Sequence, residues 1–163
     1  MNQPITPNEL RQAMTRYSDE FTDEQRIELF QHFATAQPAL AYSLDFPEKE
    51  NFTEVIRINV CHFAAIIYML FKDRFEMPEV TEEDIIDIYK RIDGMLNYIN
   101  GDAEAELEVE RLYPEPALLH HVKEFILEHH AYLSPVQHFD IFFALGGLVD
   151  AFAQAKKLYA ASS

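Results

Sequence analysis

A chain of 163 residues, 48% of them hydrophobic, is long enough to form one domain that buries roughly two-thirds of its unfolded surface, which excludes extended disorder. Cys61 is its one cysteine, so an internal disulfide and a zinc site built from several cysteines are excluded. The net charge of −15 argues against direct binding of nucleic acid or of an anionic membrane, and it favours encounter with basic partners.

Prolines and glycines separate the stretches that have a helical pattern. Proline fixes φ and lacks an N–H group, so it is tolerated in the first turn of a helix and disrupts the interior. We therefore predict an all-α fold, a single-domain bundle of five or six helices over residues 1–163. The end segments 1–5 and 160–163 are expected to be flexible. The prolines that mark candidate helix ends are Pro4, Pro7, Pro38, Pro47, Pro78, Pro114, Pro116 and Pro135.

The first two helices are predicted from their capping residues. Thr6 with Glu9 three residues later predicts a start for a helix over 7–17, and Thr22 with Gln25 does so for a helix over 22–35. Pro38 then ends or kinks that helix before a short helical piece at 39–44.

Residues 52–75 form the most apolar early segment, and apolar positions cover well over half of its helical circumference. We expect this helix to be central, surrounded by protein on most sides. Asn59 and His62 are three residues apart and project from its apolar face, where they need hydrogen-bond partners. They are therefore either a ligand-binding pair or a core network that fixes the helix register. Cys61 is expected to pack as a small apolar residue.

A surface helix is predicted over 81–100, because a narrow stripe of isoleucines and Leu96 faces inward while acids crowd its first turn. Gly101 is expected to stop it. The next segment, 102–112, alternates acidic and other residues with a period of two, but its Ala, Glu and Leu content favours a short helix. Its acids are either a solvated face or a docking face for a basic protein: Glu104, Glu106, Glu108 and Glu110.

The helix predicted over 116–131 carries two histidine pairs, 120–121 and 129–130. Imidazole and carboxylate groups suit a divalent transition metal, and convergence of this helix with 52–75 would assemble four ligands. The candidate metal set is His62, His121, Glu128 and His129. The alternative is that these histidines titrate without a function. The spacings Glu-x-x-His and His-Glu-x-x-His do not occur in the chain.

The last predicted helix, 134–159, begins with Ser134 as cap and Pro135 in its first turn. A stripe of small residues runs along it beside a broad arc of large apolar ones, which allows close approach of a second helix. The stripe either packs against the helix at 52–75 or forms a homodimer seam. Its members are Ala144, Gly147, Ala151 and Ala155.

Catalytic motifs are absent from the sequence: there is no nucleophile elbow and no glycine-rich phosphate loop. We therefore lean against an enzyme and expect no cofactor. The leading hypothesis is a cytoplasmic, non-enzymatic acidic protein that binds a basic protein partner as an adaptor or inhibitor. The alternatives are a metal-dependent or small-molecule-binding bundle and an acidic mimic of nucleic acid. The cytoplasmic setting is inferred from the absence of a signal-peptide pattern and from an apolar run, 60–71, too short for a membrane span.

Overall fold

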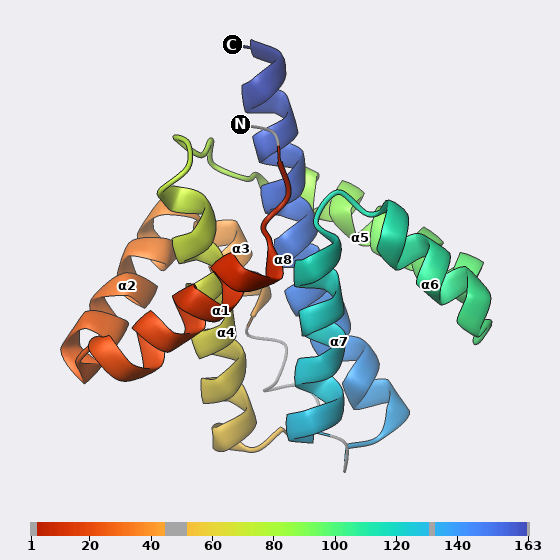
Figure 1. Ribbon diagram of the computed structural model, residues 1–163, viewed down its shortest axis with the longest axis horizontal. Helices are drawn as coiled ribbons and strands as arrows, with labels where there is room; N and C mark the ends of the chain where they lie inside the picture. Colours follow the sequence, from red (N-terminus) through yellow and green to blue (C-terminus); the bar gives the residue numbers. More distant parts are fainter. Residues whose placement is uncertain (1–2, 45–51, 131–132, 163) are drawn as a thin grey trace.

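The computed structural model describes residues 3–44, 52–130 and 133–162, and over these ranges the protein is all-helical (Figure 1). The elements are α1 (Pro7–Thr15), a π-helical turn η1 (Arg16–Glu20), α2 (Asp23–Ala36), α3 (Pro38–Ser43), α4 (Glu54–Lys72), α5 (Glu82–Ile99), α6 (Ala103–Leu112), α7 (Pro116–His130) and α8 (Pro135–Ser162).

The all-α prediction is confirmed, but the count of five or six helices is wrong, since the described residues contain eight α-helices. The two additional members are α3 and α6, which coincide with the short helical pieces expected at 39–44 and 102–112. Each stands as a separate helix because the backbone breaks before it. Gln37 leaves the helical region (φ −135°, ψ 64°) before α3, and Asn100 with Gly101 turns left-handed before α6.

The helix boundaries follow the capping residues. Thr6, Thr22 and Thr81 each accept a hydrogen bond from the backbone N–H three residues later. Each threonine also donates its own backbone N–H to the side chain there, which completes a capping box. At the end of α5, the positive φ angles of Asn100 (37°) and Gly101 (79°) stop the helix, as expected for a glycine in this place.

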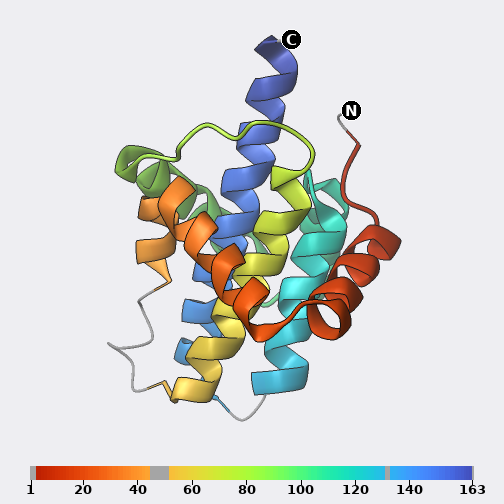
Figure 2. The same ribbon diagram turned by 90° about the vertical axis from the view of Figure 1, so that its left-hand side faces the viewer.

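Two apolar helices, α4 and α8, lie against each other through the middle of the molecule (Figure 2). α1 and α2 cover α4, while α5 and α7 cover α8. Residues 63–69 of α4 and 144–153 of α8 are buried in succession. The central position predicted for 52–75 therefore holds for α4, and α8 shares it. α8 has three packed neighbours, α4, α5 and α7, which together can bury all of its sides.

The remaining helices are amphipathic and lie outside this pair. α5 buries Ile88 and Ile92 and exposes its acidic first turn, which confirms the predicted surface helix. α6 has no buried residue and contacts α5 and α7. The alternating acids of 102–112 thus belong to a helix whose stability depends on its two neighbours.

Buried polar groups fasten the half of the molecule built by α5–α8. The carboxylate of Asp150, 3% exposed, accepts hydrogen bonds from Arg91 at 2.9 and 2.7 Å and from the Tyr113 hydroxyl at 2.9 Å. Burial first, and then the neighbouring Asp150, raises the pKa of Tyr113 far above its usual range, so the hydroxyl remains a donor. A second buried pair joins Glu115 to Lys156.

Ile5 precedes α1 in the stretch expected to be flexible, and its side chain is 1% exposed. Its backbone N–H donates to the carboxylate of Glu115 at 2.7 Å. Residues 1–2 and 163 lie outside the described part of the chain.

By length and composition, two helices of the described residues could cross a membrane, 54–72 and 135–161. Half of the apolar window of the first and 61% of that of the second are buried inside the structure. Core helices of a bundle meet the same criteria, so the finding does not distinguish the two settings.

Candidate functional site

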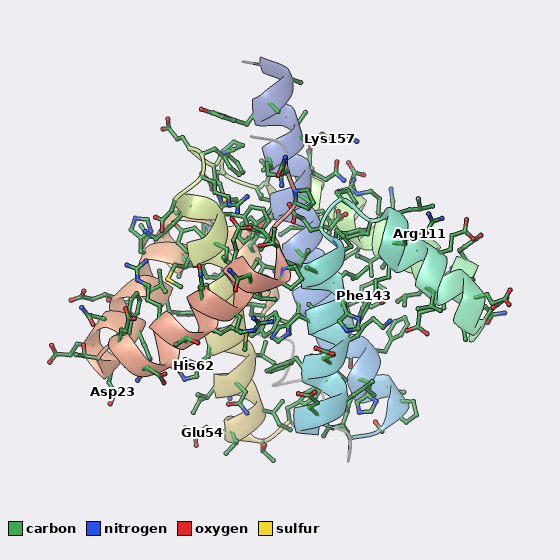
Figure 3. The ribbon with its side chains drawn as sticks, in the orientation of Figure 1. Asp23, Glu54, His62, Arg111, Phe143 and Lys157 are labelled. Atoms are coloured by element: carbon green, nitrogen blue, oxygen red, sulfur yellow. The ribbon has the colours of Figure 1, made fainter. Side chains whose placement is uncertain are left out.

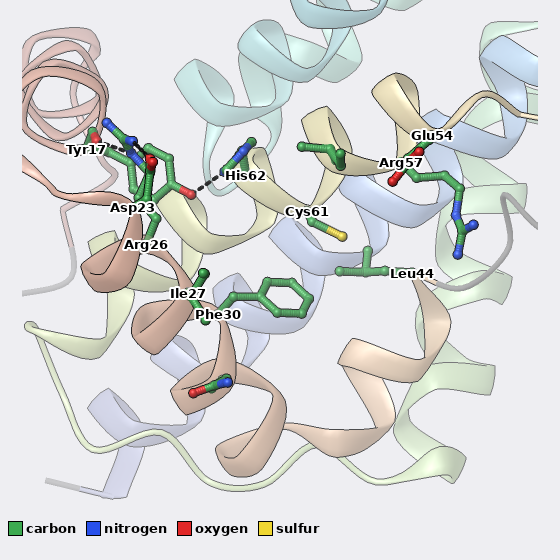
Figure 4. A pocket seen from close by; sticks show the side chains of 12 residues that line it. Tyr17, Asp23, Arg26, Ile27, Phe30, Leu44, Glu54, Arg57, Cys61 and His62 are labelled. Atoms are coloured by element: carbon green, nitrogen blue, oxygen red, sulfur yellow. Dashed lines mark hydrogen bonds and ion pairs between the residues drawn. The ribbon is translucent and has the colours of Figure 1, made fainter.

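An open groove of about 800 Å³ lies between η1, α2, the end of α3 and the first half of α4 (Figure 4). Its volume is within the range of about 300–1,000 Å³ usual for ligand sites. Polar side chains gather at its two ends and apolar side chains lie between them. The lining residues are Tyr17, Asp23, Arg26, Ile27, Phe30, Gln31, Leu44, Glu54, Arg57, Ile58, Cys61 and His62.

The π-helical turn places the first of these side chains. Between α1 and α2 the backbone N–H of Phe21 donates to the carbonyl of Arg16, five residues earlier, at 3.1 Å. Single π-helical turns widen a helix by one residue and often occur at functional sites. Tyr17 lies on this turn, its side chain buried and its hydroxyl in contact with His62 on α4.

Tyr17 and His62 form a neutral hydrogen-bonded pair at one end of the groove. Burial raises the pKa of Tyr17 and lowers the pKa of His62, with the nearby Arg26 lowering the latter further and Asp23 opposing it. At neutral pH the phenol is therefore protonated and the imidazole uncharged, and the phenol oxygen shares a hydrogen bond with Nδ1 of the ring.

Arg26 bonds to several groups beside this pair. It donates to the carbonyl oxygens of Tyr17 at 3.0 Å and Ser18 at 2.6 Å, and it forms an ion pair with Asp23 at 2.7 Å. Its guanidinium group also lies 5.6 Å from the centre of the Tyr17 ring. These contacts fasten the end of η1 to α2, so Arg26 organises this end of the groove.

The middle of the groove is apolar and accessible. Ile27 of α2 is 58% exposed and Ile58 of α4 is 46% exposed, while Leu44 also lines the groove and is buried. The two long walls present the same kinds of side chain at the same helical spacing. Each has an acid, then an arginine three residues later and an isoleucine one residue further: Asp23, Arg26 and Ile27 on α2, and Glu54, Arg57 and Ile58 on α4.

Of the pair Asn59 and His62, only His62 lines the groove among the residues described here. Asn59 is half-buried on a different part of the α4 surface. Cys61 also lines the groove and is half-buried.

The predicted metal ligands have different neighbours. His62 pairs with Tyr17, whereas the His121 ring stacks on Phe63 at 5.3 Å, and neighbouring positions on α4 diverge by about 100°. Glu128 is exposed, and the side chain of His129 lies outside the described residues. Over the described part of the chain, no three His, Cys, Asp or Glu side chains are grouped as a metal site. A site that includes His129 stays a prediction.

The four acids of α6 divide into two stripes, because helical spacing separates positions two residues apart. Glu106 and Glu110 face α7, where both bind Lys123 at 2.6 and 2.9 Å, and Glu110 also contacts His120 at 2.6 Å. Glu104 and Glu108 are exposed. Two of the four acids are therefore paired within the chain, and docking of a basic protein on this helix stays a prediction.

The small-residue stripe of α8 is buried within the chain. Ala144, Ala151 and Ala155 are 3–6% exposed, and Gly147 lies against Ile88 and Tyr89 of α5. The stripe thus packs internally, with Gly147 against α5, on a helix that also packs on α4. A homodimer through these residues would require α8 to leave its neighbours.

Sequence reasoning missed Tyr17, Arg26, Ile27 and Ile58 as site residues. Neither side chain of the Tyr17–His62 pair signals its partner 45 residues away. The breadth of the apolar arc on α4 was the available signal, since a helix so apolar leaves some of its surface uncovered when its neighbours are short.

No family model matches the chain, and comparisons with curated proteins and with solved structures likewise give no significant match. The groove is therefore interpreted from its own geometry.

Proposed function

We propose that the protein is a non-enzymatic interaction protein, of adaptor or inhibitor type, whose groove binds an amphipathic basic helix of a protein partner. The observation that carries the proposal is the accessible apolar strip of the groove, Ile27 and Ile58, on a chain of net charge −15. Large apolar side chains that line an open groove mark binding surfaces more often than isolated exposed ones do.

The shape of the groove supports a helix as occupant. Apolar side chains project into it from two helices that cross, as in complexes where one face of an amphipathic helix lies in a hydrophobic groove. Such a ligand contributes anchors at positions i, i+3 or i+4, and i+7. The neutral Tyr17–His62 pair and the engaged Arg26 can stay in place while it binds.

Charge supports a basic partner. Residues 16–28, which form the outer wall, contain five acids and two arginines. Besides Asp23, the exposed acids of this segment are Asp19, Glu20, Glu24 and Glu28. Asp23 and Glu54 mark opposite ends of the groove on one side of the molecule (Figure 3). At least six basic side chains of the described residues bind carboxylates within the chain, which leaves an acidic surface for steering.

The test uses a fluorescein-labelled 18-residue peptide of leucine and lysine arranged as an amphipathic helix, with anisotropy as the readout. The Ile27→Ser, Ile58→Ser double variant should weaken binding at least tenfold, because both anchors of the strip are lost. Raising the salt from about 50 to 500 mM should weaken binding to the wild type, since charge steering is screened.

The matched control is Leu107→Ser, a change of an equally exposed apolar residue (66%) on α6, outside the groove. It should leave the affinity unchanged. Equal losses for Leu107→Ser and the double variant would show that the peptide binds the acidic surface at large. If the affinity of the wild type for the peptide does not change with salt, the electrostatic part of the proposal is wrong.

A further inference from the structure

A second site, away from the groove, holds the extended segment that precedes α1. Residues 3–6 are non-helical, and their side chains other than Ile5 are exposed. Ile5 enters the core, where it belongs to the same buried cluster as residues of α4, α7 and α8. The segment therefore inserts one aliphatic side chain into the body of the protein, in the manner of a bound peptide.

The backbone of this segment is recognised by charged side chains. Ile5 donates its N–H to Oε2 of Glu115 at 2.7 Å, and Gln3 accepts at its carbonyl from Nζ of Lys156 at 2.9 Å. Arg74 reaches the same carbonyl at 3.5 Å. Pro4, between the two recognised groups, has no N–H and needs no acceptor. One donor and one acceptor of an extended tripeptide are thus both satisfied.

The recognising groups come from the body of the bundle. Glu115 immediately precedes α7 and is fully buried, and Lys156 on α8 is 8% exposed. Lys156 binds Oε1 of Glu115 and lies 5.9 Å from the ring centre of Phe71 on α4. Since α4, α7 and α8 pack on one another directly, the ion pair is held in place by elements other than the segment it binds.

We propose that Glu115 and Lys156 form a peptide-binding site for an extended segment in which proline is followed by an aliphatic residue. In this chain residues 3–5 fill the site, and a second copy of the chain can supply the same segment in trans. Exchange of this segment between copies needs no new contacts, because the site is already complementary to it.

The experiment offers the site a peptide of residues 1–8, labelled with fluorescein. The receptor is full-length Ile5→Asp, whose own segment cannot seat a charged side chain in the core. A second receptor lacks residues 2–5. We expect both to bind the peptide, and to bind an Ile5→Asp version of it at least tenfold more weakly. Wild-type protein should bind at least tenfold more weakly than either receptor, because its site is filled.

Two controls decide between recognition and loose association. Adding Lys156→Met to the Ile5→Asp receptor should weaken binding at least tenfold, whereas adding Lys157→Met, the neighbouring exposed lysine, should not. Equal affinity for the two peptides, or no binding to a folded receptor, would overturn the proposal. If a receptor unfolds, the wild-type peptide should restore its helical circular dichroism, and failure to do so would also overturn it.

Discussion

The two halves of the molecule handle polar groups in opposite ways. In the half built by α5–α8, ionised side chains are buried and bonded, as Asp150 is to Arg91 and Tyr113. In the half built by α1–α4, the polar pair Tyr17–His62 is uncharged and stands beside an open apolar strip. A buried charge needs a complete set of partners and so demands closure, whereas a neutral pair tolerates an accessible neighbour. The closed half pairs its buried charges, and the open half leaves an apolar strip accessible.

The largest effect expected from this comparison is in the closed half. Lys156→Ala should lower the free energy of unfolding by about 3–5 kcal/mol, because it leaves the carboxylate of Glu115 buried without its counter-ion. Urea denaturation at pH 7 measures it. Lys157→Ala, one residue further and exposed, should stay within about 0.5 kcal/mol of the wild type. Similar small losses for both variants would mean that the buried pair is not a stabilising feature.

A smaller loss is expected for Tyr113→Phe. This change removes the hydroxyl that donates to Asp150 and keeps the ring, so about 1–3 kcal/mol should be lost, as for hydrogen bonds to charged groups. Thermal and urea unfolding both report it. Tyr98→Phe is the control, since Tyr98 is 60% exposed and should change stability by less than about 0.5 kcal/mol. If Tyr113→Phe has the same stability as the wild type, Arg91 alone satisfies the hydrogen-bonding needs of Asp150.

In the open half, shortening an apolar side chain of the groove should change the free energy of unfolding only slightly. Ile58→Ala should cost less than about 1 kcal/mol, since the side chain is 46% exposed and leaves no cavity. Ile56, two residues earlier on α4 and 1% exposed, gives the contrast, because Ile56→Ala should cost about 2–5 kcal/mol. Matching losses at the two positions would show that the groove is closed in solution.

The smallest effect is the pH dependence contributed by His62. Burial lowers its pKa in the folded protein, so the unfolded chain binds the proton more readily and stability falls as the pH drops below the ordinary histidine value of 6.5. This loss ends once the pH passes below the folded pKa. His62→Gln should therefore flatten the decline in unfolding free energy between pH 7.5 and 5.5. Identical slopes for the two proteins would contradict it.

Local features of the fold could be predicted from the sequence because their causes are local. Thr6, Thr22 and Thr81 begin helices through residues three positions away, and Gly101 follows the end of one. The choice of central helix was only half predictable. Both α4 and α8 are apolar on most sides, and a single sequence does not state how many neighbours each one has.

The candidate site was less predictable than the helices. Its residues are distant from one another in the chain, and one of them is placed by a π-helical turn, which adds a single residue to the helix. The π-helical turn at 16–20 has no composition that separates it from an α-helical end. Ile27 and Ile58 look like core residues, since apolar character does not reveal exposure. Partners such as Arg91 and Asp150 are 59 residues apart, beyond any helical spacing rule.

The bond between Gln3 and Lys156 spans 153 residues, almost the whole chain, and this sets an order on folding during synthesis. A ribosome adds residues at about 5–20 per second, so the segment before α1 is made well before α8. Lys156 follows Gln3 by 153 residues, so Ile5 waits roughly ten seconds or longer for this partner while the intervening helices form. The segment before α1 is thus made early and fixed in place late.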